Sequence, residues 1–139
     1  MTLIVVPVRY PLSEHSAATL REAITISENR NAELTVLHVD LYQNSRTVTR
    51  TDLKRAVESE FGELTDTRYV IRQGFLLEET ILEEIVGENA DLVVIGSKQT
   101  GRWRRMVRKL RSDPDIGDYL RGELDCSVVT VTADGATSE

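Results

Sequence analysis

The feature that most constrains the fold of this chain is a regular alternation of strand-like runs with longer amphipathic stretches. Strand-like runs recur at residues 3–8, 33–39, 67–72, 91–96 and 127–132. The first and fourth are apolar segments rich in valine and isoleucine, which is typical of strands buried on both faces of a sheet. Such an alternation favours parallel strands joined by right-handed crossovers. We therefore predict a single-domain α/β fold: five mostly parallel strands in a doubly wound, Rossmann-like sheet, with helices on both faces.

Four helices are predicted between these runs. Their candidate starts are Ser13 or Ser16, Thr51 or Asp52, a position near Leu77, and Asp113 followed by Pro114. Serine, threonine and aspartate side chains cap helix N-termini, and proline is favoured in the first turn. The segment from Gly96 to Asp113, between the fourth strand and the fourth helix, is predicted to be a loop.

The length of 139 residues indicates one domain, which we place at residues 1–133, followed by a flexible C-terminal tail at 134–139. The single cysteine, Cys126, cannot form an internal disulfide and is expected to be a small buried apolar residue. The first apolar run lacks the features of a secretory leader, and no stretch approaches the roughly 20 apolar residues of a bilayer span. We therefore predict a cytoplasmic protein with no membrane association.

Charge is distributed unevenly along the chain. The net charge is −6, yet residues 96–112 contain seven lysines and arginines and no acid, so that all 23 acids lie elsewhere. In a doubly wound sheet, ligands bind beyond the carboxyl ends of the strands where the winding direction switches, which here means the loops Arg9–Ser13 and Gly96–Asp113. The basic segment can therefore steer anions to this edge of the sheet.

Two interpretations of the basic segment stay open. If it binds an anion or a nucleotide, with Trp103 able to stack on a base, the site residues are Gly96, Ser97, Lys98, Arg102 and Arg104. If it is a solvated charge run, it balances the acidic body or pairs with a neighbouring subunit, and the pattern favours this second interpretation. A single aromatic residue argues against a nucleic-acid partner. Weak binding of polyvalent anions is the functional alternative.

The glycines of this segment do not form a P-loop. Gly96 and Gly101 have the spacing of the two P-loop glycines and follow a strand. However, Arg102 and Trp103 stand where lysine and serine or threonine are required to reach phosphate and Mg²⁺. We interpret the match as a chance near-miss.

No other motif indicates catalysis or a metal site. Two histidines are too few for a metal cluster, and His38 is expected to be a hydrogen-bonded residue of the sheet. Ser13 and Ser16 lie close to His15 in sequence, yet both serines are better explained as helix caps than as nucleophiles. We therefore predict no catalytic residues and no metal.

Several short motifs recur in an order that is informative as a set. They are Val-Pro-Val at 6–8, Ser-Glu-His-Ser at 13–16, Ala-Glu-Leu-Thr-Val-Leu-His-Val at 32–39, Gly74, Ala-Asp-Leu-Val-Val-Ile-Gly-Ser at 90–97, and Cys-Ser-Val-Val-Thr-Val at 126–131. In this order and spacing the chain resembles the universal stress protein (UspA) family over nearly its whole length. The resemblance implies an adenine-nucleotide-alpha-hydrolase-like sheet and a role in stress response or regulation.

The resemblance also implies the absence of the family's usual ATP site. ATP-binding members carry an aspartate directly after the first strand, where this chain has Arg9–Leu12. They also carry Gly-x-x-Gly, nine residues, then Gly-Ser/Thr after the fourth strand, a pattern that lets backbone N–H groups approach phosphates. Here Gly96 matches, but the other three positions hold Gln99, Lys109 and Leu110. Alignment backwards from Cys126 places Pro114 and Asp115 at the last pair, which is no better.

We therefore predict a non-catalytic, cytoplasmic stress-response or regulatory protein with no cofactor, for which ATP is the disfavoured alternative. The resemblance and an apolar last strand both imply a homodimer formed through Val128–Val131. The alternative function is an adenine-nucleotide-binding or anion-binding regulatory module that uses the basic segment 98–111. A nucleotide hydrolase that depends on Ser97 or Lys98 is a third hypothesis.

Overall fold

The computed structural model describes residues 2–43, 47–111, 127–132 and 137–138. The strands are β1 (Leu3–Pro7), β2 (Glu33–Leu41), β3 (Thr67–Gly74), β4 (Leu92–Gly96), β5 (Ser127–Val131) and β6 (Thr137–Ser138). The helices are α1 (Glu14–Arg30), α2 (Arg50–Phe61), α3 (Leu77–Glu88) and α4 (Ser97–Arg111). Within the described ranges, no helix is long and apolar enough to cross a bilayer.

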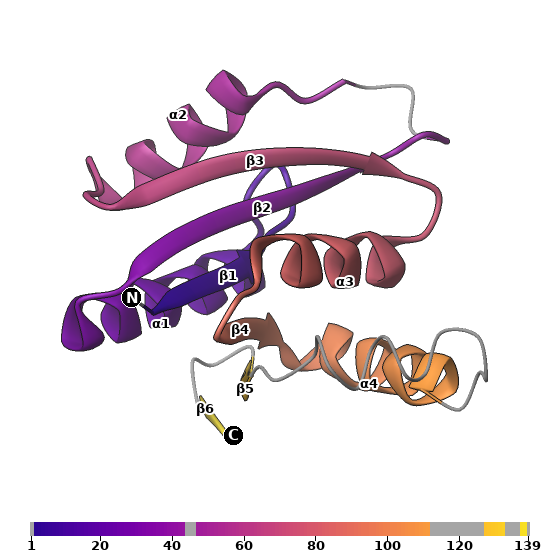
Figure 1. Cartoon of the computed structure of the whole chain (residues 1–139). Helices are drawn as coiled ribbons and strands as arrows, with labels where there is room; N and C mark the ends of the chain where they lie inside the picture. The colour runs from indigo at the N-terminus through magenta and orange to yellow at the C-terminus, as the bar shows by residue number, and fades with distance from the viewer. Residues whose placement is uncertain (1, 44–46, 112–126, 133–136, 139) are drawn as a thin grey trace.

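The strands form one sheet in the order β3-β2-β1-β4-β5-β6 (Figure 1). β1 to β5 are parallel, and the short β6 pairs antiparallel with β5. The predicted five-stranded, doubly wound α/β fold is therefore confirmed, with one short strand added. The chain builds outward from β1 to β3 and then returns to place β4 against the other edge of β1. The winding direction thus switches between β1 and β4.

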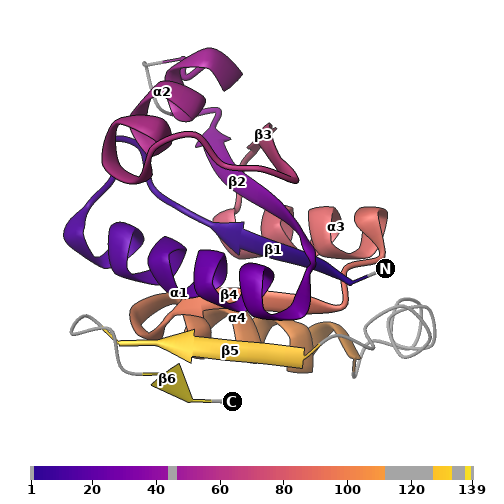
Figure 2. The same ribbon diagram turned by 90° about the vertical axis from the view of Figure 1, so that its left-hand side faces the viewer.

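Helices cover both faces of the sheet, and β1 is buried on both sides as predicted, as are its neighbours β2 and β4. In Figure 2, α1 lies in front of the sheet and α4 behind it. Alternate residues of β1 enter different cores: Ile4 and Val6 pack with residues of α1 and α2, whereas Val5 packs with residues of α3 and α4. The side chains of all three are fully buried. This two-sided burial is the reason for the continuous apolar run at residues 3–8.

Helix caps follow the sequence signals with one correction. Ser13 is the N-cap of α1, and its Oγ accepts a hydrogen bond from the N–H of Ser16. The predicted caps of α2, Thr51 and Asp52, are wrong, because the N-cap is Thr49. Asp52 instead completes a capping box by accepting from the backbone N–H of Thr49.

The largest correction concerns the segment after β4. The predicted loop between Gly96 and Asp113 is wrong, because residues 97–111 form the helix α4, which starts directly after the strand. The physical reason is Trp103, which is only 3% exposed and packs into the core beneath β1 and β4. One face of the basic segment is therefore anchored. The helix predicted from Asp113 lies outside the described residues.

The C-terminal tail also differs from expectation. Residues 134–139 are predicted to be flexible, yet Thr137–Ser138 form β6 and pair with Thr130 and Val131 of β5. The outer edge of β5 is therefore covered in part by the same chain. Cys126, expected to be buried, lies outside the described residues.

Candidate functional site

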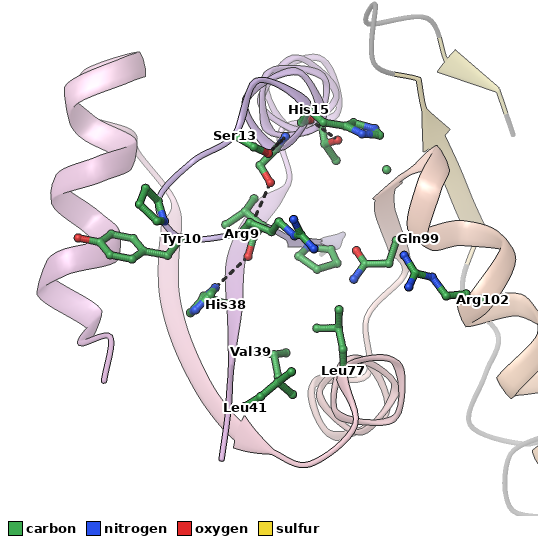
Figure 3. A pocket seen from close by; sticks show the side chains of 16 residues that line it. Arg9, Tyr10, Ser13, His15, His38, Val39, Leu41, Leu77, Gln99 and Arg102 are labelled. Atoms are coloured by element: carbon green, nitrogen blue, oxygen red, sulfur yellow. Dashed lines mark hydrogen bonds between the residues drawn. The ribbon is translucent and has the colours of Figure 1, made fainter. Parts of the chain in front are cut away.

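A pocket of about 830 Å³ opens at the carboxyl ends of the strands, at the switch between β1 and β4 (Figure 3). It is lined by the segment after β1, the first turns of α1, the end of β2, and the starts of α3 and α4. The polar residues among them are Arg9, Tyr10, Ser13, His15, Ser16, Thr19, His38, Gln99 and Arg102. The pocket lies where the topology predicts a ligand site, and its volume is in the range of small-molecule sites.

The starts of three helices border this pocket. Ser13 caps α1, Leu77 is the first residue of α3, and Gln99 lies in the first turn of α4. All three helices begin at this edge because each one follows a strand that ends there. The N-terminal ends of helices carry partial positive charge. The backbone therefore contributes a potential that favours negative charge in the pocket.

Two arginines add side-chain charge. Arg9 follows directly after Val8, and its backbone N–H donates to Ser16 Oγ at 3.0 Å, which fixes the segment against α1. Figure 3 shows its side chain in the middle of the pocket, directed toward Gln99 and Arg102. None of the described residues that line the pocket is an aspartate or a glutamate. The pocket is therefore positive within a chain that is acidic overall.

Arg102 forms an ion pair with an acid of α3, Glu78. The Nε of Arg102 lies 3.9 Å from Oε1 of Glu78, and 61% of the arginine side chain is exposed. A long ion pair at the surface contributes little free energy because water screens it. An anion in the pocket can therefore compete with Glu78 for this guanidinium.

Both histidines of the chain line the pocket, and each is fixed by a backbone carbonyl. The Nε2 of His15 lies 3.1 Å from the carbonyl oxygen of Val131, at the end of β5. The Nδ1 of His38 lies 3.1 Å from the carbonyl oxygen of Val8. His38 is 9% exposed, so its predicted role as a hydrogen-bonded sheet residue is confirmed.

Gly96 has a packing role at this site. A Cβ atom built at this position would lie 2.9 Å from Nε2 of His15. At this distance either the histidine ring or the backbone would have to move. The carbonyl oxygen of Gly96 also accepts a hydrogen bond from Thr100 Oγ1 at 2.9 Å. Glycine therefore makes room for an imidazole where β4 passes into α4.

Only some of the five candidate site residues from the sequence line the pocket. Gly96 and Arg102 line the pocket. Ser97 and Arg104 are not among the lining residues, and Arg104 is exposed. The side chain of Lys98 lies outside the described part of the chain. Trp103 cannot stack on a base as the sequence suggested, because it is buried in the core.

Most of the polar lining residues were not selected as site residues from the sequence, among them Arg9, His15, His38 and Gln99. A signal existed for Arg9, because it is the first polar residue beyond β1 in the predicted ligand segment. No local signal marks the histidines, because the carbonyls that fix them belong to Val131 and Val8, far away in sequence.

The two serines near His15 have structural roles. Ser13 Oγ accepts from the N–H of Ser16, and Ser16 Oγ accepts from the N–H of Arg9. Between these described residues there is no hydrogen bond from either serine to His15. The described residues also contain no group of three or more histidine, cysteine, aspartate or glutamate side chains able to hold a metal ion.

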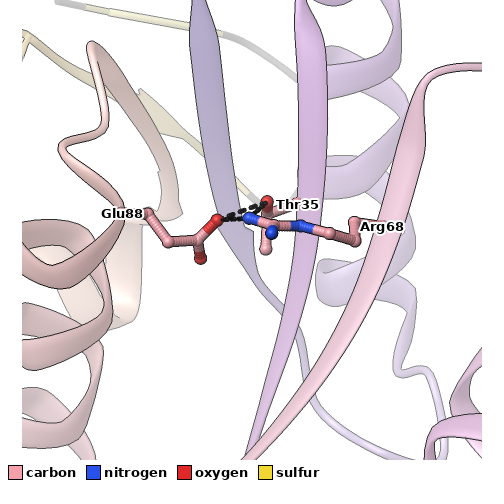
Figure 4. Close-up of polar contacts among 3 residues, drawn as sticks. All are labelled: Thr35, Arg68 and Glu88. Atoms are coloured by element: carbon pink, nitrogen blue, oxygen red, sulfur yellow. Dashed lines mark hydrogen bonds and ion pairs between the residues drawn. The ribbon is translucent and has the colours of Figure 1, made fainter.

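A separate polar cluster lies at the opposite end of the sheet (Figure 4). Oε1 of Glu88 accepts from Thr35 Oγ1 at 2.9 Å and forms an ion pair with Arg68. Thr35 is fully buried, and Glu88 lies in the last turn of α3. This cluster ties the end of α3 to β2 and β3, and it does not border the pocket.

Comparison with known proteins agrees with this architecture. The family model for the universal stress protein family matches residues 1–132. The chain belongs to the universal stress protein family. This confirms the resemblance found in the sequence, and membership supports a role in stress response. No curated protein sequence matches the chain.

Solved universal stress proteins share the fold at low sequence identity. UspA from Lactobacillus plantarum is 21% identical, with a TM-score of 0.55 and coverage of 93% of this chain and 96% of that one. A universal stress protein in complex with cAMP is 21% identical, with a TM-score of 0.56 and coverage of 91% and 95%. A family member from Burkholderia pseudomallei is 15% identical, with a TM-score of 0.59 and coverage of 94% and 95%. These similarities show the fold alone.

Proposed function

We propose that this chain is a non-catalytic, regulatory universal stress protein whose pocket binds a small organic anion and does not hold ATP through a glycine loop. The observation that carries the proposal is the charge of the pocket. Arg9 and Arg102 line it, no described lining residue is acidic, and three helix N-termini border it. In a chain of net charge −6, such a local excess of positive charge favours anions.

The second part of the proposal, the absence of the usual ATP loop, is supported by the start of α4. The helix begins directly at Ser97, and Gln99 places a side chain in the pocket where ATP-binding relatives have glycine. The imidazole of His15 lies directly against Gly96. A glycine loop binds phosphate through exposed backbone N–H groups, and this segment offers little room for that approach.

The non-catalytic part is supported by the roles of the polar lining residues. Ser13 and Ser16 are engaged with backbone N–H groups, and both histidines are fixed by carbonyls. A nucleophile activated by a base needs a hydrogen bond between the two side chains. The described lining residues do not provide such a pair.

The second candidate function is binding of an adenine nucleotide in the same pocket. It is favoured by the volume of about 830 Å³ and by the cAMP complex of one structural relative. A cyclic monophosphate carries one negative charge and needs no glycine loop for a triphosphate.

The proposal further includes a cytoplasmic location. It is supported by the single cysteine, which cannot form an internal disulfide.

The test is a thermal-shift and calorimetric panel with sulfate, phosphate, carboxylates, cAMP, AMP and Mg-ATP. Binding at one hundred times the dissociation constant stabilises the folded state by about 2.7 kcal/mol, which gives a shift of several degrees. We expect stabilisation by small anions, with a loss of about tenfold or more in affinity for Arg9→Gln and Arg102→Gln. Arg104→Gln is the matched control, because this exposed arginine does not line the pocket.

Each outcome of the panel is decisive. Stabilisation by Mg-ATP far above that by sulfate would contradict the absence of the ATP site. Stabilisation by cAMP and AMP alone would support the second candidate. Equal effects of the Arg9, Arg102 and Arg104 variants would show that the pocket is not the anion site.

A further inference from the structure

The two histidines of the chain converge on one pocket from different elements. His15 lies in the first turn of α1, and His38 lies in β2. Figure 3 shows them on either side of Arg9. Histidine is the side chain whose charge ordinarily changes between about pH 5 and 8. Both side chains of this type in the chain line the same pocket.

The carbonyl contacts determine which nitrogen of each ring can take up a proton. A carbonyl oxygen only accepts hydrogen bonds, so Nε2 of His15 and Nδ1 of His38 must carry hydrogen in the neutral ring. The nitrogens left to take up a proton are Nδ1 of His15 and Nε2 of His38. Neither nitrogen has a hydrogen-bond partner among the described residues. A protonated ring keeps its carbonyl contact and gains a second N–H donor.

The charged side chains that line the pocket are two arginines. Arg9 comes from the segment after β1 and Arg102 from α4, and Arg102 also pairs with Glu78 of α3. The ring of Tyr10 meets His38 edge-on at 6.2 Å between centroids, and tyrosine is neutral at these pH values.

Two further acids lie near the histidines without lining the pocket. Asp40, two residues after His38 in β2, is 5% exposed and accepts from the N–H of Val48. Glu14, next to His15, is exposed in the first turn of α1. On β5 the ring of His15 contacts the carbonyl of Val131, and on β4 it lies against Gly96. An anion in the pocket would thus be the main source of new negative charge for either ring.

We propose that His15 and His38 couple anion binding in this pocket to proton uptake, so that the protein binds its anion more tightly as the pH falls. The inference rests on the proposed anion-binding function and adds its regulation. An anion lowers the free energy of the imidazolium forms, and by linkage the imidazolium forms raise the affinity for the anion. The ligand class is a small dianion such as a sulfate or phosphate group, because arginine side chains bind such groups with charge-assisted hydrogen bonds.

The probe is inorganic sulfate, which keeps its two charges between about pH 5.5 and 8, the interval in which histidine changes its charge. Affinity is measured by calorimetry across this range in buffers of different ionisation enthalpy, which counts the protons taken up on binding. We expect net uptake of protons and an affinity that rises by up to about tenfold per pH unit for each proton. Ring signals of the two histidines, followed by NMR on the wild-type protein, should move toward the protonated form when sulfate is added at constant pH.

Two variants distinguish the effect of losing a protonatable ring from the effect of losing its hydrogen bond to the carbonyl. His15→Gln places an amide N–H near Nε2, and His38→Asn places one near Nδ1, so each variant can still donate to its carbonyl but cannot gain a charge. Each should lower the number of protons taken up, and the double variant should bind sulfate with no pH dependence. Arg104→Gln should retain the wild-type pH dependence.

The outcomes distinguish this inference from the function on which it rests. Absence of sulfate binding at every pH would overturn the proposed anion site itself. Binding whose affinity is the same at each pH, or histidine signals that do not respond to sulfate, would overturn only the coupling. Should a histidine variant fail to fold, the NMR experiment on the wild-type protein still decides.

Discussion

At the scale of single residues, the contact between Gly96 and His15 links α1 to two strands of the sheet. Gly96 ends β4, and His15 reaches from α1 to the last carbonyl of β5. From the sequence alone, Gly96 matches the first glycine of a phosphate-binding pattern. Its actual neighbour is a side chain 81 positions earlier, so no local pattern could have predicted the contact.

Gly96→Ala and Gly101→Ala should therefore change stability in opposite directions. A Cβ at position 96 would lie 2.9 Å from Nε2 of His15 and force this ring away from Val131, whereas a Cβ at position 101 would meet nothing within 4 Å. We expect a loss of about 1–3 kcal/mol in the free energy of unfolding for Gly96→Ala. Because Gly101 lies inside α4, its replacement should add about 0.5–1 kcal/mol. Urea unfolding measures both, and a loss at position 101 as large as at 96 would contradict the packing role.

The buried Tyr69 should lower the free energy of unfolding at alkaline pH. Burial, with the nearby negative charge of Glu58, raises the pKa of Tyr69 to about 12. The unfolded phenol ionises near its ordinary value of about 10. Between these values the unfolded state loses the proton first, so the free energy of unfolding falls by about 1.4 kcal/mol per pH unit. Below pH 10 both states are protonated and the effect vanishes.

Tyr69→Phe should remove this part of the alkaline decline. Among the described residues the buried Tyr69 hydroxyl has no hydrogen-bond partner, so its removal should cost little at neutral pH. Guanidinium unfolding of both proteins at several pH values provides the measurement. Parallel stability curves for the two proteins from neutral pH to about pH 12 would contradict the prediction.

At the scale of elements, the sequence predicts those with strong apolar periodicity and fails where charge obscures it. The five predicted strands and the first three helices appear close to their expected bounds. α4 was missed because a high density of arginine and lysine is typical of solvated segments. The signal that could have revealed it is the spacing of Thr100 and Trp103, both of which are buried. A few inward residues are enough to anchor a helix whose other faces are charged.

Trp103 is thus the anchor of α4, and Trp103→Ala should destabilise the protein by about 3–5 kcal/mol. The exposed neighbour Arg104 is the matched control, and Arg104→Ala should change stability by less than about 0.5 kcal/mol. Trp103 is the single tryptophan of the chain, so its emission reports directly on this site. We expect a blue-shifted maximum that moves to the red on unfolding. Emission typical of exposed indole in the folded protein would contradict the anchoring role.

At the scale of the whole molecule, the open edge of β5 is the surface for which we propose homodimerisation. β6 covers β5 only opposite Thr130 and Val131. The N–H of Ser127 donates toward β4, to the carbonyl of Asp91, and N–H groups alternate between the two edges of a strand. The N–H of Val128 therefore faces away from β4, where a second copy can pair with it.

Val128→Pro should remove this donor and convert the proposed dimer to a monomer. Val128→Thr is the matched control, because it keeps the N–H and the branched shape and should leave the dimer intact. Light scattering gives the mass of each variant, and circular dichroism shows that it is folded. A folded Val128→Pro variant that retains the dimer mass would exclude this edge as the interface.

The pairing of β1 with β4 has a consequence for synthesis on the ribosome. β1 lies between β2 and β4, so one edge of this wholly apolar strand lacks its partner until residues 92–96 have left the exit tunnel. During this interval the nascent chain displays an unpaired apolar edge, which is the surface that aggregation and chaperone binding use. The final fold thus places its first strand in the middle of the sheet, and the nascent chain must keep that strand from premature association while more than half of the protein is made.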